Sequence, residues 1–465
     1  MTKNIIALAA AALMTSSCGV LKNYERPTDI QTAGIYGDAQ SGDSLGLGDL
    51  PWRTIFTDPQ LQGLIEKALA QNTNMVNADL QLQQVEYALK ASKLAFVPSI
   101  YFSPQGSISK MYDPYDRSQY NALTDGNNKS YSLPVSLGWQ NVNFLQLRNA
   151  KKSAEVNLEQ MHNAKQAIQA KLVASVAQLY YNLCMLDEQL AIMQATQENW
   201  GTYLDMQRKL MDAGQSNKAA VASIEATYHS ISSSVVTLEN NIRIMQNSLS
   251  TLMGESAQTY GRSSLATFQA PGLIETGLPI TILKRRPDVR QAELTLANSF
   301  YDMNKAKAAF WPSLNLSANG QFTNSLGSAI INPGMMIGSA IAGLTQPIFA
   351  NGRIRAQYKI SKAQLEIDAN NFQQAVIAAG NEVNTAMLEL KNAETKRELI
   401  GKQVESLQTA LDATKLLYAH SSANYLNVIT AQNSLLSAQM DYISNRMSAI
   451  QATISLYQAL GGGTE

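Results

Sequence analysis

The side chains that could carry out catalysis or bind a metal are few and widely spaced. The histidines are His162, His229 and His420, and none has a second histidine or a cysteine at the spacing of a metal site. The sequence contains neither a glycine-rich phosphate loop nor a serine nucleophile elbow. We therefore expect a protein that is not an enzyme, holds no metal ion and needs no cofactor other than a covalent lipid, for which Cys18 is the candidate.

Cys18 follows a segment that has the pattern of a secretory signal peptide. Lys3 precedes an apolar stretch, 5–14, and three small residues stand directly before Cys18. Small residues before the cysteine and Gly19 after it resemble the bacterial lipobox, in which the cysteine is acylated and becomes the mature N-terminus. We expect cleavage after residue 17 and lipid on Cys18. Ordinary cleavage nearby, without lipid, is the alternative.

Composition narrows the class of protein further. The chain has 465 residues, 45% hydrophobic and 15% charged, and its 36 basic residues balance 36 acidic ones. The chain is neutral and its sequence shows no basic patch or acidic tail that would suggest nucleic-acid binding, so none is expected. No apolar stretch after the signal peptide approaches the ~18 residues of a spanning helix, so any membrane crossing must use strands in a closed sheet. The second cysteine, Cys184, lies in an apolar helical stretch and is expected to be buried.

The two halves of the chain repeat one another, because AFVPSI at 95–100 returns as AFWPSL at 309–314. We divide the chain into a signal peptide (1–17), a lipidated N-terminal extension (18–50), a first structural repeat (51–270) and a second (271–465). The first repeat is expected to hold strands at about 98–142 and a helical hairpin at about 143–254. The second is expected to hold strands at about 312–349 and a hairpin at about 352–460.

Long helices are expected where proline is absent, at 135–270 and 348–465. Apolar residues recur there every three or four positions, as in Leu172, Val176, Leu179 and Leu183. About 60 helical residues span on the order of 90 Å, so these helices must pack along one another as coiled coils. Breaks at Asp212-Ala213-Gly214 and His420-Ser421-Ser422 indicate the tips of two hairpins.

In four short stretches apolar residues recur at every second position, as in β-strands with one apolar face. Their alternating positions are Ile100/Phe102, Leu133/Val135/Leu137/Trp139, Leu314/Leu316/Ala318 and Met335/Ile337/Ser339/Ile341. One interpretation is a small soluble sheet packed on the helices. If the strands lie in a membrane, four of them cannot close a barrel, so several copies of the chain must share one. Two copies would give a barrel whose lumen is filled by side chains, and three would leave an aqueous pore.

Two charged motifs are expected to be architectural. Asp58-Pro59 is typical of an N-cap followed by proline at the first helical position. Pro287 and Asp288 likewise open a helix, and Arg285, Arg286 and Arg290 near that positive end are unfavourable unless paired. We expect them to form structural ion pairs with a belt of short helices or with a neighbouring copy of the chain, and a ligand-binding role is the alternative.

Motifs spread over nearly the whole mature chain resemble one family. They are Trp52 to Pro59 with Leu61 and Leu64; Leu278-Pro279 followed by Arg285 to Arg290; Pro347-Ile348-Phe349 with Gly352-Arg353; and the ending Leu456 to Gly463. In these motifs the chain resembles the TolC-like lipoprotein outer-membrane factors of resistance-nodulation-division efflux systems, of the NodT type.

The resemblance implies a fold, a function and partners. The fold class would be α+β membrane: an internally duplicated chain with a long coiled-coil α-helical barrel and four β-strands per chain in a shared twelve-stranded trimeric β-barrel. The function implied is passive export of drugs, metal ions or metabolites through a lipid-anchored outer-membrane channel that extends into the periplasm. The partners implied are a homotrimer, a periplasmic adaptor, a proton-driven inner-membrane pump, which would set selectivity, and outer-membrane lipid.

The chain departs from the family at the expected periplasmic entrance. The family commonly has Asp and Arg after the second hairpin tip, where this chain has Thr430 and Asn433. Leu426, Thr430 and Asn433 recur every three or four positions and share one helical face, which we expect to line the gate, with Val428 pointing outward.

The repeat places Lys218, Ala222 and Glu225 at the equivalent positions of the first hairpin. Lys218 and Glu225 are either a charged latch that replaces the missing Asp and Arg or a solvated helix face. A smaller departure, Phe144-Leu145-Gln146 where the family has Phe-Gly-Arg, follows the second strand.

Two other functions fit the sequence. One is a duct for secreted proteins, and the other is a lipid-anchored structural or adhesive coiled-coil protein without a pore. Conductance in a planar bilayer would separate a channel from a scaffold.

Overall fold

The computed structural model describes residues 24–26, 50–109, 128–265, 268, 286–324, 335–420 and 425–463. Cys18 and the signal peptide lie outside the described residues, as do Leu278, Pro279 and Arg285. The chain forms two compact units, and each draws on both sequence repeats. We call them the sheet unit (Met1–Thr28, Gln83–Glu159 and Glu293–Asn370) and the helical unit (Asp29–Leu82, Gln160–Ala292 and Asn371–Glu465).

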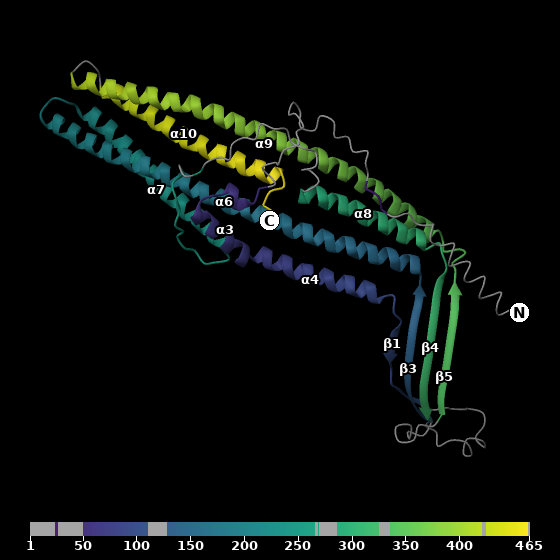
Figure 1. The fold of residues 1–465 in the computed structure, drawn as a ribbon. Helices are drawn as coiled ribbons and strands as arrows, with labels where there is room; N and C mark the ends of the chain where they lie inside the picture. The colour runs from purple at the N-terminus through teal and green to yellow at the C-terminus, as the bar shows by residue number, and fades with distance from the viewer. Residues whose placement is uncertain are drawn as a thin grey trace. The chain divides into compact units, whose positions relative to one another are not determined.

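The order of elements repeats once along the chain (Figure 1). The first half contains α2 (Trp52–Ile55), α3 (Pro59–Gln71), α4 (Thr73–Leu94), β1 (Ser99–Phe102), β2 (Gln105–Ser109), β3 (Asn128–Val142), α6 (Phe144–Asp212) and α7 (Lys218–Met253). The second contains α8 (Pro287–Ala308), β4 (Ser313–Asn324), β5 (Met335–Thr345), α9 (Arg353–Ala419) and α10 (Tyr425–Ala459). Each half thus runs from a helix through strands into a helical hairpin, which is the predicted duplication.

The strands form one antiparallel sheet in the order β1-β3-β4-β5, with β2 also paired to β3. The first predicted strand is interrupted at Ser103 and Pro104, so β1 and β2 follow one another along the same neighbour. The pairing of β3 with β4 joins the two repeats into a single sheet.

The hydrogen-bond register gives the sheet one apolar face. Ile100, Leu137, Ala318 and Ala340 lie opposite one another in sequence across the four neighbouring strands. The same face carries further apolar residues, Phe102, Leu133, Val135, Trp139, Leu314, Leu316, Ala342 and Leu344. Ser136, Asn319 and Ser339 are aligned on the other face.

The prediction for the last strand was wrong in its choice of face. Ile341 pairs with Ser317, so it lies on the more polar face, and the apolar face of β5 is formed by Ala340, Ala342 and Leu344. In β5 both the odd-numbered and the even-numbered positions carry small and apolar residues, so alternation alone does not show which face is apolar. Pairing with β4 selects it, since a slip of one residue would invert every side chain.

The helical unit has its core between the long helices and the N-terminal helices. Its large buried side chains include Trp52, Tyr180, Tyr181, Leu183 and Tyr457. The N-cap prediction is confirmed, because the Asp58 carboxylate accepts a hydrogen bond from the Gln60 backbone N–H at 2.9 Å and Pro59 opens α3. No described helix is both long and apolar enough to span a bilayer.

Small residues line the face of α9 that is buried within the helical unit. On α9 the buried alanines Ala379, Ala386 and Ala393 are seven residues apart, which returns them to one helical face. Asn445 of α10 is buried against them and donates from Nδ2 to the Ala393 carbonyl oxygen at 2.9 Å. The second hairpin is therefore held by this polar bond and by apolar contacts of Leu411 with Val428 and Leu435.

Candidate functional site: the hairpin tips and a buried arginine

The tip of the first hairpin is held by an aromatic and aliphatic cluster. Trp200 of α6 is fully buried among Leu204, Val221 and Ile224, and Tyr425 of α10 packs against this cluster. Asn217 caps α7 by accepting from the Ala220 backbone N–H at 2.9 Å. The first tip and the start of α10 are thus joined.

The predicted gate face lies on the side of α10 away from α9. Leu426 is 59% exposed, and Thr430 and Asn433 are exposed as well. Val428 and Leu435 are buried against Leu411 of α9. The expectation that Val428 points outward was wrong, because the helix turns it into the contact between α9 and α10. Leu426, Thr430 and Asn433 form what we call the gate face.

The gate face presents one apolar and two polar side chains. The Thr430 hydroxyl donates to the Leu426 carbonyl oxygen at 2.9 Å, so its remaining exposed surface is largely its methyl group and lone pairs. An ordered constriction by Leu426 with a polar turn beside it is compatible with this geometry.

The candidate latch residues of the first hairpin do not pair with each other. Lys218 and Ala222 are exposed on α7, and Glu225 accepts from Nη2 of Arg208 on α6 at 2.9 Å. Among the described residues no ion pair joins Lys218 to Glu225. Sequence reasoning missed Arg208, although its position across the first tip from Glu225 could have suggested the pair. Both side chains are well exposed, so the pair is worth little to stability.

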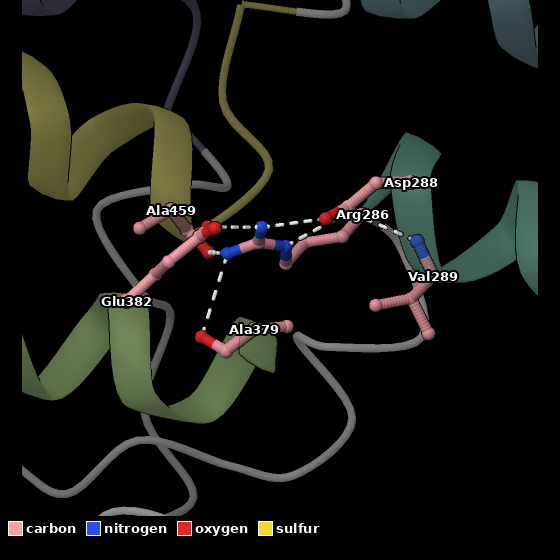
Figure 2. A network of polar contacts seen from close by, with 6 residues as sticks. All are labelled: Arg286, Asp288, Val289, Ala379, Glu382 and Ala459. Carbon is pink, nitrogen blue, oxygen red and sulfur yellow. Dashed lines mark hydrogen bonds and ion pairs between the residues drawn. The ribbon is translucent and has the colours of Figure 1, made fainter. Parts of the chain in front are cut away.

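Arg286 is the most enclosed charged group described in the helical unit. Its side chain is 6% exposed and lies between the start of α8, the middle of α9 and the end of α10 (Figure 2). Nη2 donates to Asp288 at 2.7 Å and to Glu382 at 2.5 Å. Nη1 donates to the Ala459 carbonyl oxygen at 2.8 Å and to that of Ala379 at 3.5 Å. The guanidinium therefore joins three helices.

Asp288 also bonds to the backbone in the first turn of α8. Its Oδ1 accepts from the Val289 backbone N–H at 2.9 Å and from Nε of Arg286 at 3.0 Å. Burial alone would raise the pKa of Asp288, but the hydrogen bonds and charge of Arg286 hold it below its usual value. The predicted structural ion pair of Arg286 is thus present, with partners in its own chain.

A second network joins α3 and α6 to the segment after α7. The Tyr180 hydroxyl donates to Asp58 at 2.5 Å and accepts from the Ser263 backbone N–H at 2.9 Å. Cys184, one turn further along α6, is buried as predicted, and burial raises the pKa of its thiol to about 12. A thiol held protonated in this way is a packing residue rather than a nucleophile.

The histidines do not come together, and within the described ranges no group of three His, Cys, Asp or Glu side chains could hold a metal ion. The arrangement is architectural: it fixes helix ends and hairpin tips, and it offers no reacting constellation among the described side chains.

Known proteins resemble the chain along almost its whole length. A profile of the family described as outer membrane efflux protein matches residues 64–255 and 278–462. The cation efflux system protein CusC of Escherichia coli O6:H1 is 27% identical over 464 residues, covering 97% of each chain. The probable efflux pump outer membrane protein TtgC of Pseudomonas putida is 27% identical over 475 residues, covering 100% of this chain and 96% of TtgC. The crystal structure of the open state of the Neisseria gonorrhoeae MtrE outer membrane channel shares the fold, with a TM-score of 0.85 at 22% identity over 96% of this chain and 99% of that one.

Proposed function

The chain belongs to the outer membrane efflux protein family. We propose that three copies form a passive duct for the export of small solutes. The observation that carries the proposal is the incomplete sheet. Among the described strands, β1 and β2 pair only with β3, and β5 pairs only with β4. Strand edges with unpaired backbone groups are not tolerated in hydrocarbon, so further copies must cover them.

Three copies would both pair the free strand edges and leave an open lumen. Two copies would close a sheet whose interior is filled by side chains, whereas three leave room for water. The polar face with Ser136, Asn319 and Ser339 would then line the lumen, and the apolar face would contact lipid. The exposed apolar side chains Ile100, Phe102 and Leu344, at 70%, 62% and 69%, would be covered in this way.

A passive duct takes its energy from its partners. We propose that a periplasmic adaptor connects the hairpin tips to a proton-driven inner-membrane pump, which selects the solute. The relatives named for cation efflux and for an efflux pump are equally similar to this chain, at 27% identity each. This equality supports a shared duct whose cargo is decided elsewhere in the assembly.

The channel itself is tested by conductance. Purified full-length protein, shown by native mass spectrometry to be trimeric, is expected to give discrete current steps in a planar bilayer. Leu426→Ala with Thr430→Ala is expected to raise single-channel conductance, because three smaller gate faces leave a wider constriction. Asn427→Ala is the matched control, since Asn427 is exposed on the same turn but about 100° from Leu426.

Three results would count against this proposal. A protein without current steps, or one that stays monomeric, would be a scaffold. Equal conductance in the double variant and the Asn427→Ala control would remove Leu426 and Thr430 from the gate. Val428 is unsuitable as a control, because shortening it would leave a cavity between α9 and α10.

Lipid on Cys18 is the second part of the proposal. Radiolabelled palmitate fed to cells is expected to enter the wild-type protein and to be absent from Cys18→Ala. The variant is expected to fold, because neither the described core nor the sheet uses Cys18. One acyl anchor alone gives modest membrane affinity, so part of the variant should still reach the membrane through its strands. Label that persists in Cys18→Ala would refute lipidation at this residue.

A further inference from the structure

Basic side chains gather in the sheet unit where the helices meet the strands. Arg148, Lys151 and Lys152 lie in the first turns of α6, and Arg355, Lys359 and Lys362 lie in the first turns of α9. We call these six residues the basic collar. The five strands beside them carry a single charged residue, Lys129 at the distant end of β3. Charge therefore changes abruptly from nearly none to strongly positive at the ends of the strands.

Helix electrostatics do not explain the collar. The positive partial charge of a helix N-terminus acts within its first turn, so it disfavours Arg355 and stabilises none of the other collar residues. The acidic groups nearby are few: Glu155 pairs with Lys151 and Lys152, and Glu366 lies 3.8 Å from Lys362. Each helix start keeps a positive excess, and exposed pairs of this kind contribute little. The collar is therefore an exposed positive surface, which an anionic partner would complement.

The α6 part of the collar lies on the side of the sheet that is apolar. Arg148 lies four residues after Phe144, and Lys151 and Lys152 lie three and four residues after Arg148, so Arg148 neighbours all three on the surface of α6. The ring of Phe144 contacts that of Trp139 edge to face, with centroids 5.3 Å apart. Trp139 belongs to the apolar face of the sheet, opposite Leu316. The basic residues of α6 therefore follow directly from the surface that would contact lipid.

The α9 part of the collar has the same aromatic neighbourhood. Arg355, Lys359 and Lys362 are spaced by four and three on one helical face, and Tyr358 lies beside them. The Tyr358 ring contacts Phe310 at a centroid distance of 6.1 Å. Between the end of β5 and α9, Ile348 and Phe349 are 99% and 83% exposed. Aromatic and apolar residues followed by cations are typical of a membrane and water boundary, where rings lie at headgroup level and long cations extend into it.

We infer that the basic collar binds the phosphate groups of anionic phospholipids in the leaflet at which the strands end, so that the protein selects anionic lipid for its boundary. This inference rests on the proposed membrane location of the strands. Six cations per chain would form a ring around three copies. Guanidinium and ammonium groups both suit phosphate oxygens, the former through paired N–H donors.

The chain contains its own reporters for a test. Trp139 and Trp311 belong to the sheet unit and lie near the start of α6, since Trp139 contacts Phe144 and the Trp311 carbonyl oxygen accepts from Asn143. Trp311 is 37% exposed. Trp52 and Trp200 belong to the helical unit and are 1% and 0% exposed. Quenching of tryptophan fluorescence by brominated acyl chains therefore reports on lipid beside the collar.

The full-length trimer would be reconstituted in two sets of vesicles. In one set, brominated phosphatidylcholine is mixed with unlabelled phosphatidylglycerol. In the other, brominated phosphatidylglycerol is mixed with unlabelled phosphatidylcholine. Wild-type protein is expected to prefer phosphatidylglycerol about three-fold at low salt and to lose the preference near 0.5 M salt. In a collar variant all six cations are replaced by glutamine: Arg148, Lys151, Lys152, Arg355, Lys359 and Lys362. This variant should quench about equally with both lipids, a quenching ratio of about one. Lys391→Gln with Lys396→Gln and Arg397→Gln removes three exposed cations from α9 within the helical unit and should keep the wild-type ratio.

The outcomes separate this inference from the proposed function. Equal quenching by both lipids in the wild type, or an unchanged ratio in the collar variant, overturns the inference while conductance stays intact. A collar variant with altered ion selectivity and unaltered lipid preference would place these cations in the lumen and also overturn it. Absence of quenching by either lipid would place the strands outside the bilayer and refute the proposed function as well.

Discussion

Replacement of Arg286 by methionine is expected to lower the free energy of unfolding by about 2–3 kcal/mol. The change keeps the apolar stem and removes every hydrogen bond to Asp288, Glu382 and the Ala459 carbonyl oxygen. Loss of one partner of a buried pair costs more than the pair itself contributes. The loss is smaller than for a fully buried pair, because the carboxylates of Asp288 and Glu382 are more than half exposed and can be rehydrated. Urea unfolding followed by circular dichroism would measure it.

The matched control for this prediction is Arg397→Met, an exposed arginine on α9 that should change stability by no more than a few tenths of a kcal/mol. The pH dependence supplies a second check. The pKa of Asp288 is lowered in the folded protein, so its pairing stabilises above the unfolded pKa and is lost as pH falls through the folded one. The difference between wild type and Arg286→Met should therefore shrink in acid. Equal stability of Arg286→Met and Arg397→Met would show that the contacts of Arg286 do not stabilise the fold.

Truncation of Trp200 to alanine is expected to have the largest effect at the hairpin tips. Trp200 is fully buried among Leu204, Val221 and Ile224, so the change leaves a large cavity and should cost about 3–5 kcal/mol. The free energy of local unfolding at the tip should decrease by this amount. Backbone amides from Leu204 to Val221 are expected to exchange roughly a hundred-fold to a few thousand-fold faster, as measured by hydrogen exchange with mass spectrometry.

Trp200→Phe is the informative companion variant. The indole Nε1 of Trp200 is buried and has no hydrogen-bond partner among the described residues. Phenylalanine fills most of the same space and removes this unpaired donor, so it should cost far less than alanine. If both variants exchange alike, the tip is not held by packing around Trp200, and the gate face would have to be ordered by contacts with other copies or with the adaptor.

The order of the elements followed from local signals in the sequence. Proline-free tracts with apolar residues every three or four positions became α6, α7, α9 and α10. The break at Asp212 ends α6, and the Asp58-Pro59 pair caps α3. Family membership was also predicted from short motifs, because the residues that carry them are adjacent in the chain. Such signals act through a residue's own backbone and its neighbours within one turn, so they can be read without the fold.

Contacts between distant segments were decided only by the tertiary structure. Alternation in β5 was ambiguous until pairing with β4 placed Ile341 on the more polar face. Val428 turned inward because α9 supplies Leu411 at that level. Arg286 meets Glu382 and Ala459, residues that lie far from it in the chain. Local pattern limits each segment to one helix or strand, but which of its faces is buried depends on the surface that another segment brings to it, and that surface exists only after packing.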